Sequence, residues 1–93
     1  MSMRESSVES KLHKGVLALG GIDYKLAPTT KGLPDRLVIL PDNRIFLIEL
    51  KARGGRLSPA QIAIHAKLAK RGTHVIVLTG PDEVDAWLQK EPK

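Results

Sequence analysis

Cysteine is absent from the 93-residue sequence, which excludes a disulfide framework, a thiolate zinc site and a cysteine nucleophile. The three histidines are not spaced as ligands of one metal ion, so no zinc site is expected. No apolar run approaches the roughly 18–20 residues that span a bilayer, and the first residues lack the apolar core of a signal peptide. We therefore expect a cytoplasmic protein with no membrane association.

Aromatic residues make up only 3% of the chain, whereas modules that bind single strands by base stacking generally use more. Fifteen Lys and Arg against ten Asp and Glu give a formal charge of +5 and a pI near 9.8. A small basic domain suits a polyanion, and nucleic acid is the commonest one. The composition therefore favours phosphate contacts, although a basic surface kept for solubility explains the charge equally well.

The hydrophobic pattern predicts a single α/β domain over residues 1–93, with a mixed central sheet and flanking helices. In chain order we expect a helix over 6–19, strands over 22–26, 36–40 and 45–50, a helix over 59–71, a strand over 74–78 and a helix ending near 89. Turn residues between the second and third strands predict an antiparallel hairpin. The following strand–helix–strand segment predicts a parallel pair.

Alternation and helical spacing predict which side chains are buried. Ile22, Tyr24 and Leu26 alternate with polar residues, so we expect them on the buried side of their strand. Val8, Leu12, Val16 and Leu19 form an apolar stripe on the first helix. The fifth element carries a broad apolar arc of Ile62, Ile64, Ala66, Leu68 and Ala69, and Trp87 belongs to the core.

Asp35, Glu49 and Lys51 are the residues that the core pattern does not explain. If the hairpin turn centres on Asp42, Asp35 lies directly opposite Glu49, with Cβ atoms about 4.5–5.5 Å apart. Two carboxylates this close favour a divalent cation between them, and hard oxygen ligands suit Mg²⁺ or Mn²⁺. The alternative is that Asp35 caps the turn and Glu49 pairs with Lys51 at a solvated strand end; a register slip of one residue would also separate the carboxylates.

These residues belong to a wider pattern. Residues 32–36 read G-x-P-D-R, residues 49–51 read E-x-K, residues 58–61 read S-x-x-Q, and Glu9 lies on the preceding helix. Over about residues 6–78 the chain resembles the VRR-NUC (virus-type replication-repair nuclease) family of the PD-(D/E)xK superfamily, in its minimal stand-alone form. The resemblance implies a restriction-endonuclease-like core with an α-β-β-β-α-β-α order.

The resemblance also implies an activity, a Mg²⁺- or Mn²⁺-dependent endodeoxyribonuclease that hydrolyses phosphodiester bonds. Asp35 and Glu49 would hold the metal with the Leu50 carbonyl oxygen, and Glu9 would complete the site directly or through water. Lys51 would orient or deprotonate the attacking water. The metal would lower the pKa of its bound water and offset charge on the phosphate.

Several of these residues have a second interpretation. Gln61 on its helical wheel points toward the active site, yet Ser58 and Gln61 also form a capping box. The alternative for Glu9 is a capping box with Ser6 at the start of its own helix. His65 shares the side of Gln61, and we expect it to be a core or interface histidine with its hydrogen bonds satisfied.

Three cations flank the predicted site on loops: Lys31, Arg53 and Arg56. They either hold DNA phosphates or lie on a solvated surface.

The family resemblance extends to substrate and assembly. The chain resembles the minimal stand-alone members of the family, which are homodimers that cut junctions. The resemblance therefore implies branched DNA such as the four-way (Holliday) junction as the substrate, with duplex DNA as the broader possibility. We expect contacts between copies through Trp87, Leu88 and Leu17, unless these residues only cover the sheet. A phage or mobile-element origin, in a bacterial or phage-infected cell, also follows by resemblance. The alternatives are an inactive DNA-binding module of the same fold and a structural domain of a larger complex.

Overall fold

The computed structural model describes residues 5–27 and 29–90, and it places the side chains of residues 7–27 and 29–90. The elements are α1 (Glu5–Ala18), β1 (Ile22–Lys25), β2 (Arg36–Leu40), β3 (Arg44–Lys51), α2 (Pro59–Lys70), β4 (Ile76–Thr79) and α3 (Gly80–Lys90). This is the predicted α-β-β-β-α-β-α order. Within those residues, no helix has the length and apolar character needed to cross a membrane.

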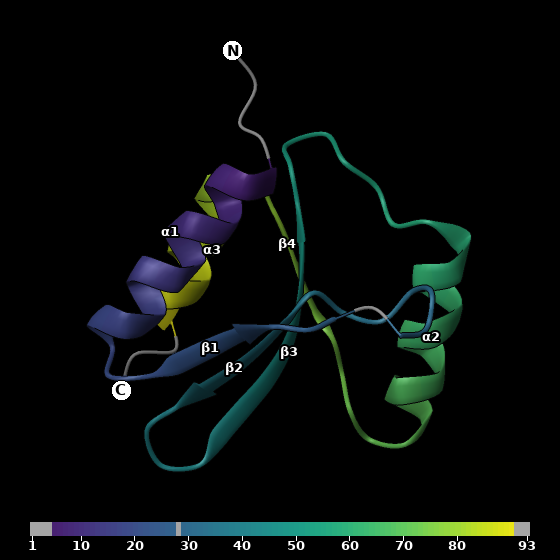
Figure 1. Cartoon of the computed structure of the whole chain (residues 1–93), viewed down its shortest axis with the longest axis horizontal. Helices are drawn as coiled ribbons and strands as arrows, with labels where there is room; N and C mark the ends of the chain where they lie inside the picture. The colour runs from purple at the N-terminus through teal and green to yellow at the C-terminus, as the bar shows by residue number, and fades with distance from the viewer. Residues whose placement is uncertain (1–4, 28, 91–93) are drawn as a thin grey trace.

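The four strands form one mixed sheet in the order β1-β2-β3-β4 (Figure 1). The β1–β2 and β2–β3 pairs are antiparallel and the β3–β4 pair is parallel, as predicted. In the hairpin, Arg36 pairs with Ile48 and Leu40 with Arg44, which is the register that a turn centred on Asp42 requires. Asp42 and Asn43 both adopt positive φ, a conformation that Asp and Asn tolerate better than most residues.

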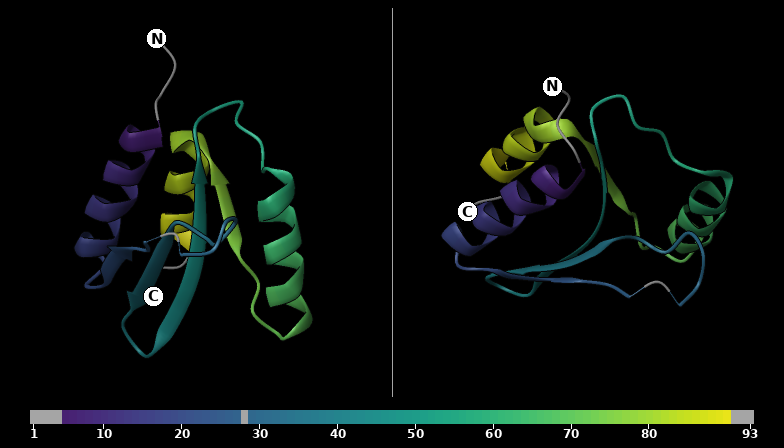
Figure 2. Two further views of the ribbon diagram at one scale, coloured as in Figure 1. Left: turned by 45° about the vertical axis from the view of Figure 1, so that its right-hand side comes forward. Right: turned by 45° about the horizontal axis from the view of Figure 1, so that its top comes forward.

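Two helices cover one face of the sheet and the third lies toward the other (Figures 1 and 2). α1 and α3 pack side by side on the first face and enclose the core. The fully or nearly fully buried apolar residues are Val8, Leu12, Val16, Val38, Leu40, Ile48, Leu50, Leu78, Val84 and Trp87. Trp87 is only 8% exposed and meets Phe46 edge to face, with ring centroids 5.1 Å apart. The predicted α1 stripe and the core position of Trp87 are thus confirmed.

The expectation for β1 is wrong. Ile22 and Tyr24 are exposed, whereas Asp23 is buried. The reason is a charged network on the inner side: Arg36 donates from Nη1 to Asp23 Oδ2 at 3.2 Å, and His13 Nδ1 lies 2.6 Å from Asp23 Oδ1. Partners of this kind offset the desolvation of the carboxylate, so the polar residue of this alternating strand faces inward.

Two further differences concern the second half of the chain. β4 begins at Ile76 rather than at residue 74. Residues 72–74 instead line a cavity of about 420 Å³ together with residues 45–47 of β3. No residue of α2 is buried, and Ile62 is exposed, so the apolar arc predicted for this helix does not form part of the core. Burial of this arc would require the sheet to cover the full length of α2.

The network at Asp23 makes a stability prediction. Asp23→Ala removes a buried counter-ion from the mostly buried Arg36, and breaking such a pair costs about 3 kcal/mol of unfolding free energy. His13→Ala is the matched control, because it removes the half-exposed partner of the same carboxylate and should cost less than about 1 kcal/mol. Urea unfolding of both variants measures the difference, and equal losses would show that the Asp23–Arg36 pair has no special weight.

Candidate active site

Asp35 and Glu49 lie next to each other at one end of the β2–β3 pair. Asp35 immediately precedes β2, and the register that joins Arg36 to Ile48 places it opposite Glu49. The Asp35 carboxylate is fixed against β3, because the Leu50 backbone N–H donates to its Oδ2 at 3.0 Å. The hairpin therefore brings together the two carboxylates that the sequence analysis singled out.

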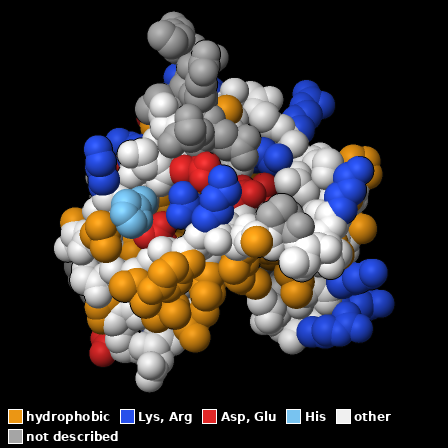
Figure 3. Space-filling view, viewed as in Figure 1, with side chains coloured by type: hydrophobic (Ala, Val, Ile, Leu, Met, Phe, Trp, Pro, Cys, Tyr) orange, Lys and Arg blue, Asp and Glu red, His pale blue; other side chains and the backbone are white. Residues whose placement is uncertain are grey.

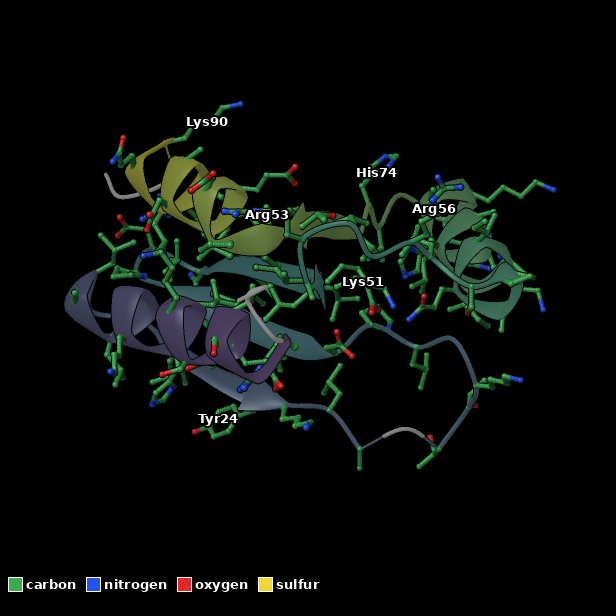
Figure 4. The ribbon with its side chains drawn as sticks, turned by 90° about the horizontal axis from the view of Figure 1, so that it is seen from above. Tyr24, Lys51, Arg53, Arg56, His74 and Lys90 are labelled. Atoms are coloured by element: carbon green, nitrogen blue, oxygen red, sulfur yellow. The ribbon has the colours of Figure 1, made fainter. Side chains whose placement is uncertain are left out.

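The Glu49 side chain is only 1% exposed, so its carboxylate needs polar partners. Gln61 donates from Nε2 to Glu49 Oε2 at 2.9 Å. Lys51 Nζ lies 3.8 Å from the same oxygen, one pleat further along β3 (Figure 4). These partners exclude the alternative in which Glu49 and Lys51 form a solvated pair at the end of a strand, since Lys51 is itself mostly buried.

Gln61 forms the capping box and also contacts the Glu49 carboxylate. Its Oε1 accepts a hydrogen bond from the Ser58 backbone N–H at 2.8 Å, and its own N–H donates to Ser58 Oγ at 3.2 Å. These two bonds complete the predicted capping box, and the amide nitrogen still reaches Glu49. One side chain thus links the start of α2 to the buried carboxylate of β3.

His65 lies beside the buried Glu49 carboxylate. Its Nε2 is buried, lies 3.8 Å from Glu49 Oε1 and has no hydrogen-bond partner among the described residues, so the expectation of a satisfied histidine is wrong. Burial, and then the nearby Lys51 ammonium, lower the pKa of His65 below its usual 6.5, while Asp35 acts in the opposite direction. The available signal was position, since His65 follows Gln61 by one helical turn.

Gly32 explains how the loop before Asp35 approaches α2. Its φ is +98°, and a Cβ at this position would lie 2.4 Å from the Ala60 carbonyl oxygen in the first turn of α2. Only glycine fits this close backbone contact. The contact seats the segment leading to Asp35 against the same helical turn that carries Gln61.

Glu9 lies in a different group of charges. Its Oε1 accepts from Arg36 Nη2 at 3.1 Å and lies 3.7 Å from Lys25 Nζ. Since α1 already includes Glu5, Ser6 lies inside the helix and not at its N-cap; the side chain of Ser6 is outside the described residues. Among the residues that the structure describes, no group of three or more His, Asp or Glu could hold a metal ion.

The sequence analysis missed the charged network that joins Glu9 to Asp23. Arg36 bridges the two carboxylates, and His13 adds a second contact to Asp23. The available signal was the position of Arg36, directly after Asp35 at the start of an apolar strand. This arginine ties α1 and β1 to the strand that begins beside the candidate site.

The three loop cations, Lys31, Arg53 and Arg56, differ in their surroundings. In Figure 4, Arg53 lies toward α3 and Arg56 toward α2. Arg53 Nη2 is 3.4 Å from Asp82 Oδ2 in a pair exposed on both sides, which is a weak interaction. Lys31 and Arg56 are exposed, and neither forms an ion pair with any other part of the chain that the structure describes.

A family model and a phage protein both match most of this chain. The family model described as "VRR-NUC domain" matches residues 5–82. The protein named "Putative nuclease p44" of Acyrthosiphon pisum secondary endosymbiont phage 1 is 44% identical over 81 residues, which cover 86% of this chain and 87% of that protein.

Two solved structures have the same fold. One, titled "VRR_NUC domain", superposes with a TM-score of 0.84 at 32% identity and covers 94% of this chain and 96% of its own. The other, titled "VRR_NUC domain protein", gives a TM-score of 0.72 at 19% identity, over 96% of this chain and 88% of its own, and supports the fold alone.

The double role of Gln61 can be separated by substitution. Gln61→Glu keeps an oxygen acceptor for the Ser58 N–H but places a second carboxylate against buried Glu49, so we expect a loss of about 2–3 kcal/mol at neutral pH. Ser58→Ala is the control, since it removes only one capping bond and should cost about 1 kcal/mol. Both are measured by urea unfolding in EDTA. Equal losses would mean that Gln61 serves only as a cap.

Proposed function

This chain belongs to the VRR-NUC domain family of nucleases, and on this premise we propose that it is a divalent-metal-dependent DNA endonuclease. The observation that carries the proposal is the pair of opposed carboxylates, Asp35 and Glu49, with Lys51 one pleat away. A protein that only binds DNA has no use for buried acidic groups facing a polyanion. The intact trio therefore favours an enzyme over an inactive binding module of the same fold.

The donor set at this end of the central strands β2 and β3 fits Mg²⁺ or Mn²⁺. Asp35 and Glu49 supply carboxylate oxygens, and the Leu50 carbonyl would supply a third hard ligand. Mg²⁺ usually keeps several waters and needs only one or two carboxylates, which suits so small a set. When bound, the ion supplies Lewis acidity, lowering the pKa of a coordinated water and offsetting negative charge on the phosphate.

The protein groups around the carboxylates have separate roles in this proposal. The Leu50 N–H and Gln61 hold Asp35 and Glu49 in place. Lys51, whose ammonium lies 3.8 Å from Glu49 Oε2, orients the attacking water or takes its proton. Glu9 acts through water, because its Oε1 is held by Arg36. Lys31, Arg53 and Arg56 contact the phosphates that flank the cut.

We further propose that the protein works as a homodimer on branched DNA such as a four-way junction. A twofold pair presents two active sites, which suits paired cuts. Of the contact residues expected from the sequence, Trp87 is buried in the core and Leu88 packs against it, as in the alternative that they only cover the sheet, whereas Leu17 is exposed. The outer sheet face, defined here as Ile22, Tyr24 and Ile45, is a better candidate, since all three side chains are exposed on one side of paired strands.

The metal site is tested by separating ion binding from cleavage. Asp35→Asn and Glu49→Gln should abolish both Mn²⁺ binding in calorimetric titration and cleavage of DNA, because each removes a charged ligand. Lys51→Ala should bind Mn²⁺ nearly as wild type but lose at least about 100-fold in cleavage rate, since its role lies in the chemical step. Unchanged Mn²⁺ affinity in both carboxylate variants, or near-normal cleavage by Lys51→Ala, would refute these assignments.

The assembly is tested by light scattering at micromolar concentration, with and without four-way junction DNA. Ile45→Glu places a charge on the outer sheet face, where the native side chain is 62% exposed, so it should give a folded monomer that cuts junctions poorly. Leu17→Glu is the matched control on α1, where the native side chain is 52% exposed, and should remain dimeric.

The reverse result for the two variants would move the interface to α1. A wild-type monomer in both conditions would contradict the dimer, and a dimer that cuts linear duplex as readily as a junction would contradict the junction preference. Neither result would affect the nuclease assignment.

A further inference from the structure

The net positive charge of the chain comes from one segment. Residues 50–81 contain six Lys and Arg and no Asp or Glu, for a net charge of +6. The rest of the chain contains nine Lys and Arg and ten Asp and Glu, for a net charge of −1. The formal +5 of the protein therefore comes entirely from the segment that includes the end of β3, the following loop and α2.

Half of these cations lie at the far end of α2. Lys67, Lys70 and Arg71 are exposed, and none of them forms an ion pair within the described part of the chain. In Figure 3, Lys and Arg side chains gather on the side of the molecule where α2 lies. By contrast, Lys11 on α1 pairs with Asp85, and Arg36 pairs with two carboxylates.

The same end of α2 borders a shallow groove. A cavity of about 570 Å³ is lined by Leu33, Ile64, Lys67, Leu68, Lys70 and Arg71. Its lining combines three apolar side chains with three cations. A DNA backbone has the matching alternation of apolar sugar faces and charged phosphates, and a phosphate contact needs none of the aromatic residues that base stacking would require.

We propose that Lys67 and Lys70 of α2 bind the DNA backbone as a second phosphate contact, beyond the loop cations, on the arm that leaves the active site along this helix. The inference rests on the proposed function for the position of the scissile phosphate. α2 suits this role because it has no buried residue and presents its cations without competing acids.

The distance along the helix gives the contact a position on the DNA. Lys67 and Lys70 follow Gln61 by six and nine residues, or about 9 and 14 Å along the helix axis. Phosphates of one strand advance about 3.4 Å along the duplex axis per nucleotide. With α2 lying along the duplex axis and Gln61 beside the scissile phosphate, the proposed contacts fall about three and four nucleotides from the cut. DNA that ends closer than this to the cut cannot reach them.

The test compares two double variants of equal charge. Lys67→Gln/Lys70→Gln removes the proposed contact. Lys14→Gln/Lys90→Gln is the control: its two lysines are exposed on α1 and α3, and Lys90, like Lys67 and Lys70, lies in the last turn of its helix. Arg71 is left in place because its Nη1 donates to the Lys67 carbonyl oxygen at the helix end.

Duplex binding is measured in Ca²⁺ over a range of salt concentrations. The α2 variant should reduce the slope of log K against log salt by about two units, and the control should keep the wild-type slope. A second series shortens the duplex from each end in turn. We expect only one of the two ends to matter. When that end is shortened to fewer than about three nucleotides beyond the cut, the α2 variant and wild type should bind equally.

The outcomes separate this inference from the proposed function. Equal slopes for the two double variants, in a protein that cuts DNA, would overturn the α2 contact and leave the nuclease intact. Loss of slope in the α2 variant alone, in a protein that cuts no DNA with any divalent ion, would support the contact and overturn the proposed activity. A length series in which neither end matters would also overturn the contact.

Discussion

The buried Glu49 carboxylate is the constraint on which one side of this molecule depends. An ionised group that is 1% exposed costs several kcal/mol unless neighbouring dipoles and charges offset the loss of water. Gln61 supplies a hydrogen bond, and Lys51 and His65 lie within 3.8 Å. Because α2 has no buried residue, its attachment relies on Gln61 and on the glycine contact with Ala60 more than on apolar packing.

The hairpin was predictable because its determinants are local. A turn rich in Asp and Asn and a side-chain period of two residues set the register, and that register alone places Asp35 opposite Glu49. The parallel β3–β4 pair follows from the helix between the strands. The core stripe of α1 follows from its 3.6-residue spacing, which the burial of Val8, Leu12 and Val16 bears out.

The errors occur where burial depends on partners that are distant in sequence. Alternation assumes that the apolar residues of a strand face inward, but Asp23 is buried because Arg36, thirteen residues later, provides its counter-charge. The apolar arc of α2 assumes an apolar surface to cover it, and the sheet offers a carboxylate there instead. His65 was misjudged for the same reason, since its neighbours come from another element.

The two faces of the sheet consequently differ in what they require. On the α1 and α3 face, apolar packing and the ion pairs of Arg36 with Glu9 and Asp23 hold the chain together, so this face mainly supplies stability. On the other face, the carboxylate pair favours a cation, the basic end of α2 favours a polyanion, and the exposed Ile22, Tyr24 and Ile45 favour an apolar partner. Metal, DNA and a second copy would meet these three requirements on the same side. In the proposed function, these surfaces are therefore the ones where the chain would bind its metal ion, its DNA and a second copy.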